Sequence, residues 1–577
     1  PNILSVTDKG VVTTLNPGTG RVRASWKYNG VNFDSSLTVS VGEKYTIMSG
    51  YLYRYEGADT VLQIPANLGA LYLSHYSKNT SGPFYGDTNV KVAIVPDGVT
   101  SVGTAAFTNC TNLETVYLPS TLQGIGYQAF SGCKKLKNIY WYTDAYFNAD
   151  FNCYTFVENG TVKKCFDEDG NYVGGFTFAN GSKTPDTACT AKNIYISQRA
   201  FNGCSALQAF DLSKTTALYD YAFASCSSLK EADITQVKYA AGRVFSDCTS
   251  LTLVKTSRDT VIGSAMFLNC NALTTVDLYS ANIGGMAFYR CKALQTVNIF
   301  EDTAIGSNAF EYCSSLSSVN FRNNAKCLRI GTRAFGDCTR LSEMTLNGLT
   351  EIGASAFLNC TALESIAFGS GSTLETVGGT PFSGCTALTT FTVSRTNRSL
   401  AVKEFIQNGK TYCLLYSRDY SRLIFAPESY AVSYDFTDGN GNVVSEIGNS
   451  AYANITAETG TLVIPEGVKS IGDYAFYRND FSVVVLPASL EYIGISAFSY
   501  CENLTRVVFL GNNLKIIENF AFYNDKALEE VALPDGVESL GTSTFRFCTS
   551  LKSIVLPASL VSLGNYVFAN DSNLSEV

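Results

Sequence analysis

The stretch Val102–Pro119 reads V-G-T-A-A-F-T-N-C-T-N-L-E-T-V-Y-L-P, and its pattern determines the fold because it recurs along most of the chain. The consensus is I-G-x-x-A-F-x-x-C-x-x-L-x-x-V-x-L-P, with an Ala-Phe pair or a close variant as its marker. Tyr452 replaces the phenylalanine in one copy. The marker phenylalanines stand at positions 107, 130, 201, 223, 245, 267, 288, 310, 335, 357, 382, 476, 498, 522, 545 and 568.

The spacing of the markers predicts 17 stacked turns. Successive markers lie 21 to 25 residues apart, except for gaps of about 70 residues after Phe130 and Phe382. Each gap is interpreted as one repeat plus an insertion of about 48 residues. Self-similarity at such a period is typical of a solenoid.

Each repeat contains one short strand and one large ring. The segment L-x-x-V-x-L alternates apolar and polar residues, as a half-buried strand does. Proline at its end, as at Pro119 and Pro487, stops the strand because proline cannot donate to a ladder. The glycine before the marker is interpreted as permitting a backbone reversal. One such unit cannot bury its own apolar face, so the sequence predicts stacked units that share a continuous core.

The cysteines follow the same register. Thirteen of the 18 stand three residues after a marker, and Asn479, Asp525 and Asp571 take this position in other turns. A disulfide framework would not accept Asp, so we predict polar side chains that tie the buried turn backbone. Cysteines one strand apart also point the same way, which is poor bridging geometry, and no C-x-x-C metal pattern occurs. The off-register cysteines are Cys153, Cys165, Cys189, Cys327 and Cys413, and a Cys153–Cys165 disulfide remains an alternative.

The repeat resembles the leucine-rich repeat of BspA-like bacterial surface proteins, and related repeats occur in treponemal and trichomonad surface proteins. The resemblance covers about residues 88–577. It extends to the second insertion, where Tyr412–Tyr416 and the residues up to Pro427 are similar to a hairpin that these proteins carry between repeats. A shorter segment similar to this hairpin runs from Gly50 to Pro65.

The resemblance implies a mainly β leucine-rich-repeat solenoid, a right-handed superhelix of short parallel strands with turns or short helical segments. It also implies a cell-surface or secreted protein that adheres to host or microbial partners, with extracellular-matrix proteins as ligands of some members. The repeats define a scaffold rather than a ligand, so the resemblance transfers no binding specificity to individual residues.

Three segments are expected along the chain. Residues 1–41 resemble the last strands of a bacterial Ig-like (group 2) domain, and we expect part of such a domain or an N-terminal cap. Residues 42–87 are expected to form an irregular or hairpin connector, and 88–577 the solenoid, with insertions at about 142–190 and 394–443. The first forty residues are less than half of an Ig sandwich. At the other end of the chain, the last repeat stops inside a strand. We therefore expect the natural protein to be longer on both sides.

Composition excludes several classes of function. The chain carries 50 acidic against 42 basic side chains, a net charge of −8, and no basic block, so it lacks the electrostatic footprint of a nucleic-acid-binding protein. No stretch approaches about 18 consecutive apolar residues, and no signal-peptide pattern opens the chain. His75 is the single histidine, which disfavours His-based catalysis and multi-His metal sites. We expect no metal and no cofactor.

Candidate binding residues lie between the last two buried positions of each strand, because this position faces the concave surface of a leucine-rich-repeat solenoid. The row is aromatic first, then polar and acidic, and then small or apolar, which suggests distinct sub-sites. Its acidic part is interpreted as a site for a cation or basic partner, or as a ladder in which Lys255 offsets its neighbours. The predicted binding residues are Tyr117, Tyr140, Tyr142, Asp211, Asp233, Lys255, Asp277, Asn298 and Asn320.

Two further surfaces have open interpretations. The aromatic run Tyr140–Tyr142, followed by Tyr146, Phe147 and Phe151, is either a protein or glycan platform, or packing in which Trp141 fills a core position. An apolar stripe late in the row either docks a partner or a second copy, or is an ordinary scatter of exposed valines. This stripe comprises Val485, Val508, Ala532 and Val555.

Two Asp/Gly loops, 167–171 and 438–442, superficially resemble calcium loops. Counted from Asp438, the sixth position is Val443 rather than Gly and the twelfth is Asn449 rather than Glu, and the first loop fails in the same way. We predict hairpin turns at both places.

The leading hypothesis is a non-enzymatic adhesion protein, extracellular or on the bacterial cell surface. Its concave face and insertions would bind a host or microbial surface protein, an extracellular-matrix protein, or a glycan. The alternative is a structural spacer that presents other domains from the surface. A remote alternative is a glycoside-active enzyme, which requires two carboxylates joined in one pocket.

Overall fold

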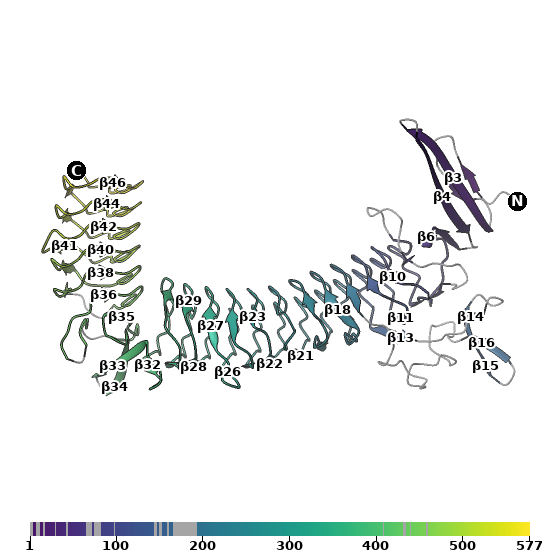
Figure 1. Cartoon of the computed structure of the whole chain (residues 1–577), viewed down its shortest axis with the longest axis horizontal. Helices are drawn as coiled ribbons and strands as arrows, with labels where there is room; N and C mark the ends of the chain where they lie inside the picture. The colour runs from purple at the N-terminus through teal and green to yellow at the C-terminus, as the bar shows by residue number, and fades with distance from the viewer. Residues whose placement is uncertain are drawn as a thin grey trace. The chain divides into compact units, whose positions relative to one another are not determined.

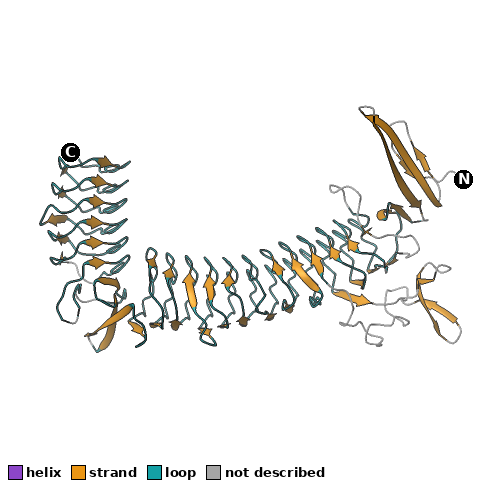
Figure 2. Cartoon of the chain, in the orientation of Figure 1, coloured by secondary structure: helices purple, strands orange, loops and turns teal. Residues whose placement is uncertain are grey.

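The computed structural model describes residues 44–64, 72–73, 82–96, 98–142, 193–407, 409–430, 434–438, 440–456 and 460–577, together with the backbone of strands within 4–41 and 147–164. These residues form short strands joined by turns, without a helix (Figure 2). No described segment is therefore a helix long and apolar enough to cross a membrane. The chain divides into two compact units, Pro1–Tyr279 and Ser280–Val577.

Unit 1 has two rows of parallel strands, one from each side of the stacked turns (Figure 1). The first row holds the L-x-x-V-x-L strands and forms what we call the strand face: β7 (Val61–Gln63), β9 (Val92–Ile94), β11 (Thr115–Pro119), β13 (Asn138–Tyr142), β19 (Glu231–Asp233), β21 (Leu253–Lys255) and β22 (Thr275–Leu278). The second sheet holds two-to-four-residue strands: β8 (Tyr72–Leu73), β10 (Ser101–Val102), β12 (Gly124–Ile125), β17 (Ile194–Ile196), β18 (Thr215–Leu218) and β20 (Tyr239–Ala240).

The N-terminal strands extend the second sheet. Its order is β20-β18-β17-β12-β10-β8-β6-β5-β4-β3, in which β3 to β6 are antiparallel neighbours. These strands are β3 (Gly18–Tyr28), β4 (Val31–Val41), β5 (Tyr45–Met48) and β6 (Tyr51–Tyr55), and β1 (Leu4–Val6) pairs separately with β2 (Val12–Thr14). The first insertion contains the antiparallel strands β14 (Phe147–Asn148), β15 (Cys153–Glu158) and β16 (Thr161–Lys164).

Unit 2 repeats the same arrangement. Its strand face holds β24 (Thr296–Ile299), β26 (Ser318–Phe321), β28 (Glu343–Leu346), β30 (Ser365–Phe368), β32 (Thr390–Val393), β37 (Thr461–Val463), β39 (Val483–Leu486), β41 (Arg506–Phe509), β43 (Glu530–Ala532) and β45 (Ser553–Val555). Its second row holds β23 (Asn282–Ile283), β25 (Thr303–Ile305), β27 (Cys327–Ile330), β29 (Glu351–Ile352), β31 (Thr376–Val377), β36 (Glu446–Ile447), β38 (Ser470–Ile471), β40 (Tyr492–Ile493), β42 (Ile516–Ile517), β44 (Ser539–Leu540) and β46 (Ser562–Leu563).

The second insertion is the predicted hairpin. β33 (Leu400–Gln407) pairs antiparallel with β34 (Lys410–Ser417), which pairs with β35 (Arg422–Phe425). β35 then lies parallel to β36, so the hairpin returns the chain to the second sheet of the solenoid. The described residues around Asp438 fit the predicted hairpin turn, because Thr437 bridges Val443 antiparallel and Asp438 Oδ1 accepts backbone hydrogen bonds from Asn440 and Asn442 at 2.7 and 2.8 Å.

The marker rings form the core. In unit 1 the stacked rings have centroids 4.7 to 5.6 Å apart, and they run through Phe84, Phe107, Phe130, Phe201, Phe223, Phe245 and Phe267. Tyr452 stacks on Phe476 at 5.8 Å and confirms that tyrosine serves as a marker. The described chain has about 19 turns rather than 17, and Phe84 supplies one of the turns that the marker pattern missed.

The solenoid therefore begins earlier than residue 88. The range 42–87 was predicted to be a connector, but β7 pairs in parallel with β9, and the ring of Phe84 stacks on Phe107 at 4.7 Å. Phe84 follows Gly-Pro instead of Ala, so it does not match the Ala-Phe marker and was not recognised as one. Part of the expected connector is thus a solenoid turn.

The glycine before the marker has a different role from the predicted one. The positive φ angles of the turns fall two residues before and two residues after the marker, as at Ala105 (52°) and Asn109 (59°) around Phe107, and not on the glycine before it. A Cβ on Gly126 would instead lie 2.7 Å from the backbone carbon of Gly103, one turn away. Glycine is required because adjacent turns approach closely there, and not because the backbone reverses.

The cysteine ladder is confirmed as a set of buried thiols that bind backbone. Cys226 Sγ donates to the carbonyl oxygen of Phe201, the marker one turn earlier, at 3.2 Å. All 15 cysteines that the structure describes are free and buried, Cys327 and Cys413 among them. The side chains of Cys153, Cys165 and Cys189 lie outside the described residues.

Candidate functional site

Neighbouring members of the predicted row of outward residues lie opposite one another on the strand face wherever their strands pair. Tyr117 pairs with Tyr140 across β11 and β13, and Asp233 pairs with Lys255 across β19 and β21. In unit 2 Asn298 pairs with Asn320 across β24 and β26. The predicted alternation places the residues on either side of this row in the core, as in the burial pattern exposed–buried–exposed–buried of β22.

The aromatic end of the row offers less surface than expected. Tyr117 is only 5% exposed, and its ring packs at 5.4 Å against that of Tyr140, which is half-buried. Trp141 is buried at 3% exposure against Phe210, so it fills the core position that was the alternative to a platform. Tyr117 therefore contributes packing, and not an exposed contact. The side chains of Tyr142, Tyr146, Phe147 and Phe151 lie outside the described residues.

Asp211 does not join the acidic row. It lies outside any strand, and its carboxylate accepts a 2.5 Å ion pair from Lys214, whose side chain is only 4% exposed. Partial burial raises the pKa of Asp211, but the hydrogen bonds from Lys214 and Ser213 outweigh this effect and hold the pKa below its usual range. Lys214 also lies over the ring of Trp141, with its nitrogen 5.9 Å from the ring centroid.

The rest of the acidic row is partly neutralised by Lys255. Lys255 forms a hydrogen-bonded ion pair with Glu231 and lies 3.5 Å from Asp233. These contacts, with Glu231 the stronger partner, raise the pKa of Lys255. Asp277 is exposed at the end of the row. Among the described residues no group of three His, Cys, Asp or Glu side chains could hold a metal ion.

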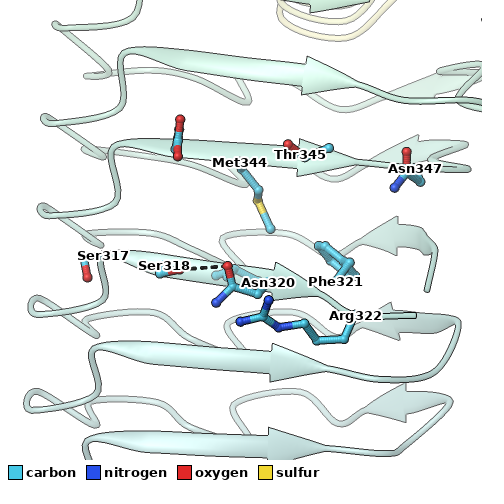
Figure 3. Close-up of a pocket in the computed structure, with 10 residues that line it drawn as sticks. Ser317, Ser318, Asn320, Phe321, Arg322, Met344, Thr345 and Asn347 are labelled. Carbon is cyan, nitrogen blue, oxygen red and sulfur yellow. Dashed lines mark hydrogen bonds between the residues drawn. The ribbon is translucent and has the colours of Figure 1, made fainter. Parts of the chain in front are cut away.

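The strand face opens into a cleft beside Asn320. β24 pairs with β26 and β28 pairs with β30, but no hydrogen-bonded pairing joins β26 to β28. A cavity of about 280 Å³ occupies this opening. Figure 3 shows Met344 reaching from β28 into the space between the two strands. The cleft is lined by Ser317, Ser318, Val319, Asn320, Phe321, Arg322, Glu343, Met344, Thr345 and Asn347.

The repeat that contains the cleft is irregular. Phe310 and Phe335 are 25 residues apart, and the additional residues form a loop in which Asn323 and Asn324 both have positive φ. Phe321 occupies a strand position that is fully buried in the neighbouring turns, as at Ile299, yet it remains partly exposed and lines the cleft.

A polar network holds the lower wall of the cleft. Asn298 Oδ1 accepts hydrogen bonds from Asn320 Nδ2 at 3.1 Å and from Arg322 Nη2 at 3.3 Å. Ser318 Oγ donates to Asn320 Oδ1 at 3.0 Å (Figure 3). The opposite wall carries Glu343 and Thr345, both exposed. The cleft thus presents the guanidinium of Arg322 and the carboxylate of Glu343 on its two walls, with the hydrogen-bonded amide of Asn320 on the same wall as Arg322.

Asn298 and Asn320 were among the predicted binding residues, and Asn320 lines the cleft, but the cleft itself was not predicted. Arg322, Glu343 and Met344 were not among the predicted binding residues. The 25-residue spacing of this repeat places additional loop residues directly after β26, but Phe357 and Phe382 have the same spacing, so spacing alone does not predict the cleft. The predicted apolar stripe is also a register row, with Val485 opposite Val508 and Ala532 opposite Val555, and Val555 is 66% exposed.

Several solved structures are similar to this chain at low sequence identity. Similar solved structures include a leucine-rich repeat protein from Bacteroides ovatus, with 20% identity over 93% of this chain and 91% of that one and a TM-score of 0.33. Others are a leucine-rich cell surface protein from Faecalibacterium prausnitzii (16% identity, 96% and 94% coverage, TM-score 0.28) and the pneumococcal vaccine antigen PcpA (15% identity, 95% and 86% coverage, TM-score 0.27).

No curated protein sequence matches the chain. A family model described as a BspA type leucine-rich repeat region of six copies matches residues 80–168, 171–295, 281–412 and 444–577, which together are most of the chain. The chain belongs to the BspA-type leucine-rich-repeat family.

Proposed function

We propose that this protein is a non-enzymatic binding or adhesion protein that works outside the cell and holds a protein partner on its strand face. The observation that carries the proposal is the cleft between β26 and β28, where the strand ladder opens and fixed polar groups line a cavity of about 280 Å³. A surface that only separates two domains has no need for such an opening. Membership of a family of repeat proteins supports the same function.

The chemistry of the cleft suits a polar segment of a partner. Arg322 supplies donors that match a carboxylate or carbonyl of the partner, and Glu343 supplies an acceptor for a cationic or amide group. Because Asn298 and Asn320 are already held by hydrogen bonds, binding costs little additional side-chain ordering. An extracellular-matrix or host-surface protein segment with both charges would fit this arrangement.

The spacer alternative is favoured by a different observation. Lys255 is paired with Glu231 and Asp233, so this part of the strand face offsets part of its own charge. Such a surface gains little from a charged partner. The glycosidase alternative receives no support from the cleft, because Glu343 is the one carboxylate in its lining where a pair is needed.

Binding of the full chain to immobilised extracellular-matrix proteins, measured by surface plasmon resonance, tests the proposal. Arg322→Ala and Glu343→Ala are expected to weaken binding to a matrix protein that the wild type captures. Arg340→Ala removes an exposed arginine outside the cleft and is the matched control. A wild type that captures none of the matrix proteins would favour the spacer. Equal binding by the cleft variants and the control would place the contact outside the cleft and contradict the proposed site.

A further inference from the structure

The second sheet of unit 1 carries a row of exposed tyrosines that the repeat itself does not require. The outward residues of β8, β10, β12, β17, β18 and β20 are in register through the pairs Tyr72–Ser101–Gly124–Tyr195–Ala217–Tyr239. Three of these six positions are tyrosine and the other three are small. The residues that follow them along the strands, such as Ile125 and Ile196, are fully buried.

The equivalent row in unit 2 has a different chemistry. Its first part runs in register through Asn282, Ala304, Arg329, Glu351 and Thr376, and Arg329 approaches Glu351 to 3.9 Å. Its second part runs through Glu446, Ser470, Tyr492, Ile516, Ser539 and Ser562, so one of these eleven positions is tyrosine. The solenoid therefore tolerates charged residues at this position, so the fold does not require tyrosine there. The tyrosine row has no charged member, which fits a neutral ligand better than a charged one.

The ring of Tyr195 lies flat on the neighbouring strand. A Cβ built on Gly124 would lie 2.1 Å from Cζ of Tyr195 and 2.4 and 2.5 Å from its two Cε atoms. Such similar distances to Cζ and to both Cε atoms mean that the added Cβ lies above the plane of the ring near Cζ, and not beside the edge of the ring. One π face thus covers the backbone of β12, while the residue remains 41% exposed through the other face.

Neighbouring tyrosines extend this surface. Tyr239 is 52% exposed and lies two strands from Tyr195, about 10 Å at the usual strand spacing. Tyr219 is 41% exposed, and its ring centroid lies 5.4 Å from that of Tyr239. Ala217 stands between Tyr195 and Tyr239 in the register and leaves room above the sheet for a ligand that contacts both rings.

We infer that this tyrosine row is a binding platform for a neutral polysaccharide. A pyranose ring presents one face of C–H bonds with partial positive charge, and this face is attracted to the negative π face of an exposed aromatic ring. A flat ring fixed on glycine costs little entropy on binding, because its orientation is already set. A chain of sugars can contact Tyr195 and Tyr239 at once. This site is independent of the cleft between β26 and β28.

Affinity electrophoresis of the full chain tests the inference in native gels that contain dextran, mannan or laminarin, which are neutral polysaccharides. We expect at least one of them to retard the wild type. Tyr195→Ala is expected to weaken the retardation about tenfold, the upper range for one aromatic contact, and Tyr239→Ala is expected to weaken it as well. Tyr566→Ala removes a tyrosine that is 68% exposed in unit 2 and should retain full retardation.

Gly124→Ala provides a second variant that leaves every tyrosine in place. Its added Cβ meets the movable ring of Tyr195 and not the backbone, so the fold should persist while the ring is lifted off the sheet. We expect weaker retardation, with unchanged thermal unfolding. The inference is overturned if none of the three polysaccharides retards the wild type, or if Tyr195→Ala and Tyr566→Ala behave alike. Arg322→Ala should be retarded like the wild type, which separates this site from the proposed function.

Discussion

Asp525 Oδ1 accepts a hydrogen bond from the backbone N–H of Cys501 at 2.8 Å, one turn earlier in the solenoid. Asp525 stands at the position where most turns have a cysteine, and the cysteine thiol donates to the marker carbonyl of the preceding turn. An ionised carboxylate can only accept hydrogen bonds. Asp525 Oδ2 is accordingly buried without a partner among the described residues, and burial raises the pKa of Asp525 well above its usual value.

We predict that Asp525→Asn removes a pH-dependent weakness from this turn. Asn479 shows the geometry, because its Nδ2 donates at 2.8 Å to the carbonyl of Tyr452, the marker one turn earlier. A carboxyl whose folded pKa is raised stabilises the fold fully below its unfolded pKa of about 4, and this contribution is lost as the pH rises. The variant should therefore gain stability over the wild type at pH 7 and gain less at pH 4.

Thermal unfolding of wild type and variant between pH 4 and pH 8 measures this effect. Asp535→Asn, at an exposed position in the same unit, is the matched control and should show no such trend. A difference between Asp525→Asn and the wild type that stays constant across the pH range would contradict the explanation.

The architecture could be predicted from the sequence because the same pattern recurs in many repeats. Every repeat has positions equivalent to the marker Phe107, the thiol position Cys110 and the outward Tyr117. A single repeat that is misinterpreted therefore does not change the predicted fold. Phe84 was missed because its turn departs from the marker dipeptide. The predicted role of the glycine before the marker was also wrong, because a contact between turns, such as that of Gly126 with Gly103, cannot be seen in the sequence of one repeat.

The candidate sites were less predictable because they depend on departures from the repeat. The cleft depends on the separation of β26 from β28, and no single residue in the sequence predicts this separation. Tyr195 lies on Gly124 although 71 residues separate them, because the first insertion stands between the two turns. Asp211 was assigned to the row by its spacing alone, and the partner that removes it from the row, Lys214, follows in an irregular loop.

The thiols of the ladder should be unreactive in the folded protein. Burial raises the pKa of Cys248 to about 12 and also raises that of Cys204, so very little thiolate exists at pH 8. We expect titration with Ellman's reagent to find almost no reactive ladder thiol in the native protein. In denaturant without reductant, the ladder cysteines should all react. Near-zero free thiol after denaturation would instead indicate disulfides.

Glu428 should make the return from the second insertion sensitive to pH. Its Oε2 accepts the N–H of Gly384 at 2.9 Å and its Oε1 accepts Asn454 Nδ2 at 2.6 Å, so one carboxyl joins turns on both sides of the hairpin. Burial raises the pKa of Glu428 to about 7, although these hydrogen bonds act in the opposite direction. Its contribution to stability is thus complete below about pH 4.5 and is lost as the pH rises through 7, for a total of about 3 kcal/mol.

Glu428→Gln should remove this pH dependence. Denaturant unfolding from pH 4.5 to pH 8 should show the wild type losing stability relative to the variant as the pH rises. Glu491→Gln, an exposed residue 3.8 Å from Lys469, is the control and should leave the slope unchanged. The same slope in Glu428→Gln and the wild type would show that another group titrates.

Lys214 and Lys255 should differ in their effect on stability, although each pairs with carboxylates near the strand face. The Lys214 side chain is 4% exposed and lies 2.5 Å from Asp211, whereas that of Lys255 is 47% exposed. Lys214→Met keeps most of the volume but leaves the Asp211 carboxylate, which is only 20% exposed, without its cation, and this should cost about 2 kcal/mol. Lys255→Met breaks a solvated pair, which salt and water already weaken, and should leave the free energy of unfolding unchanged within error. Urea unfolding of both variants measures the difference. Equal losses would mean that the Asp211–Lys214 pair is as well solvated as the exposed one, and Asp211 would then return to the set of residues available for a partner.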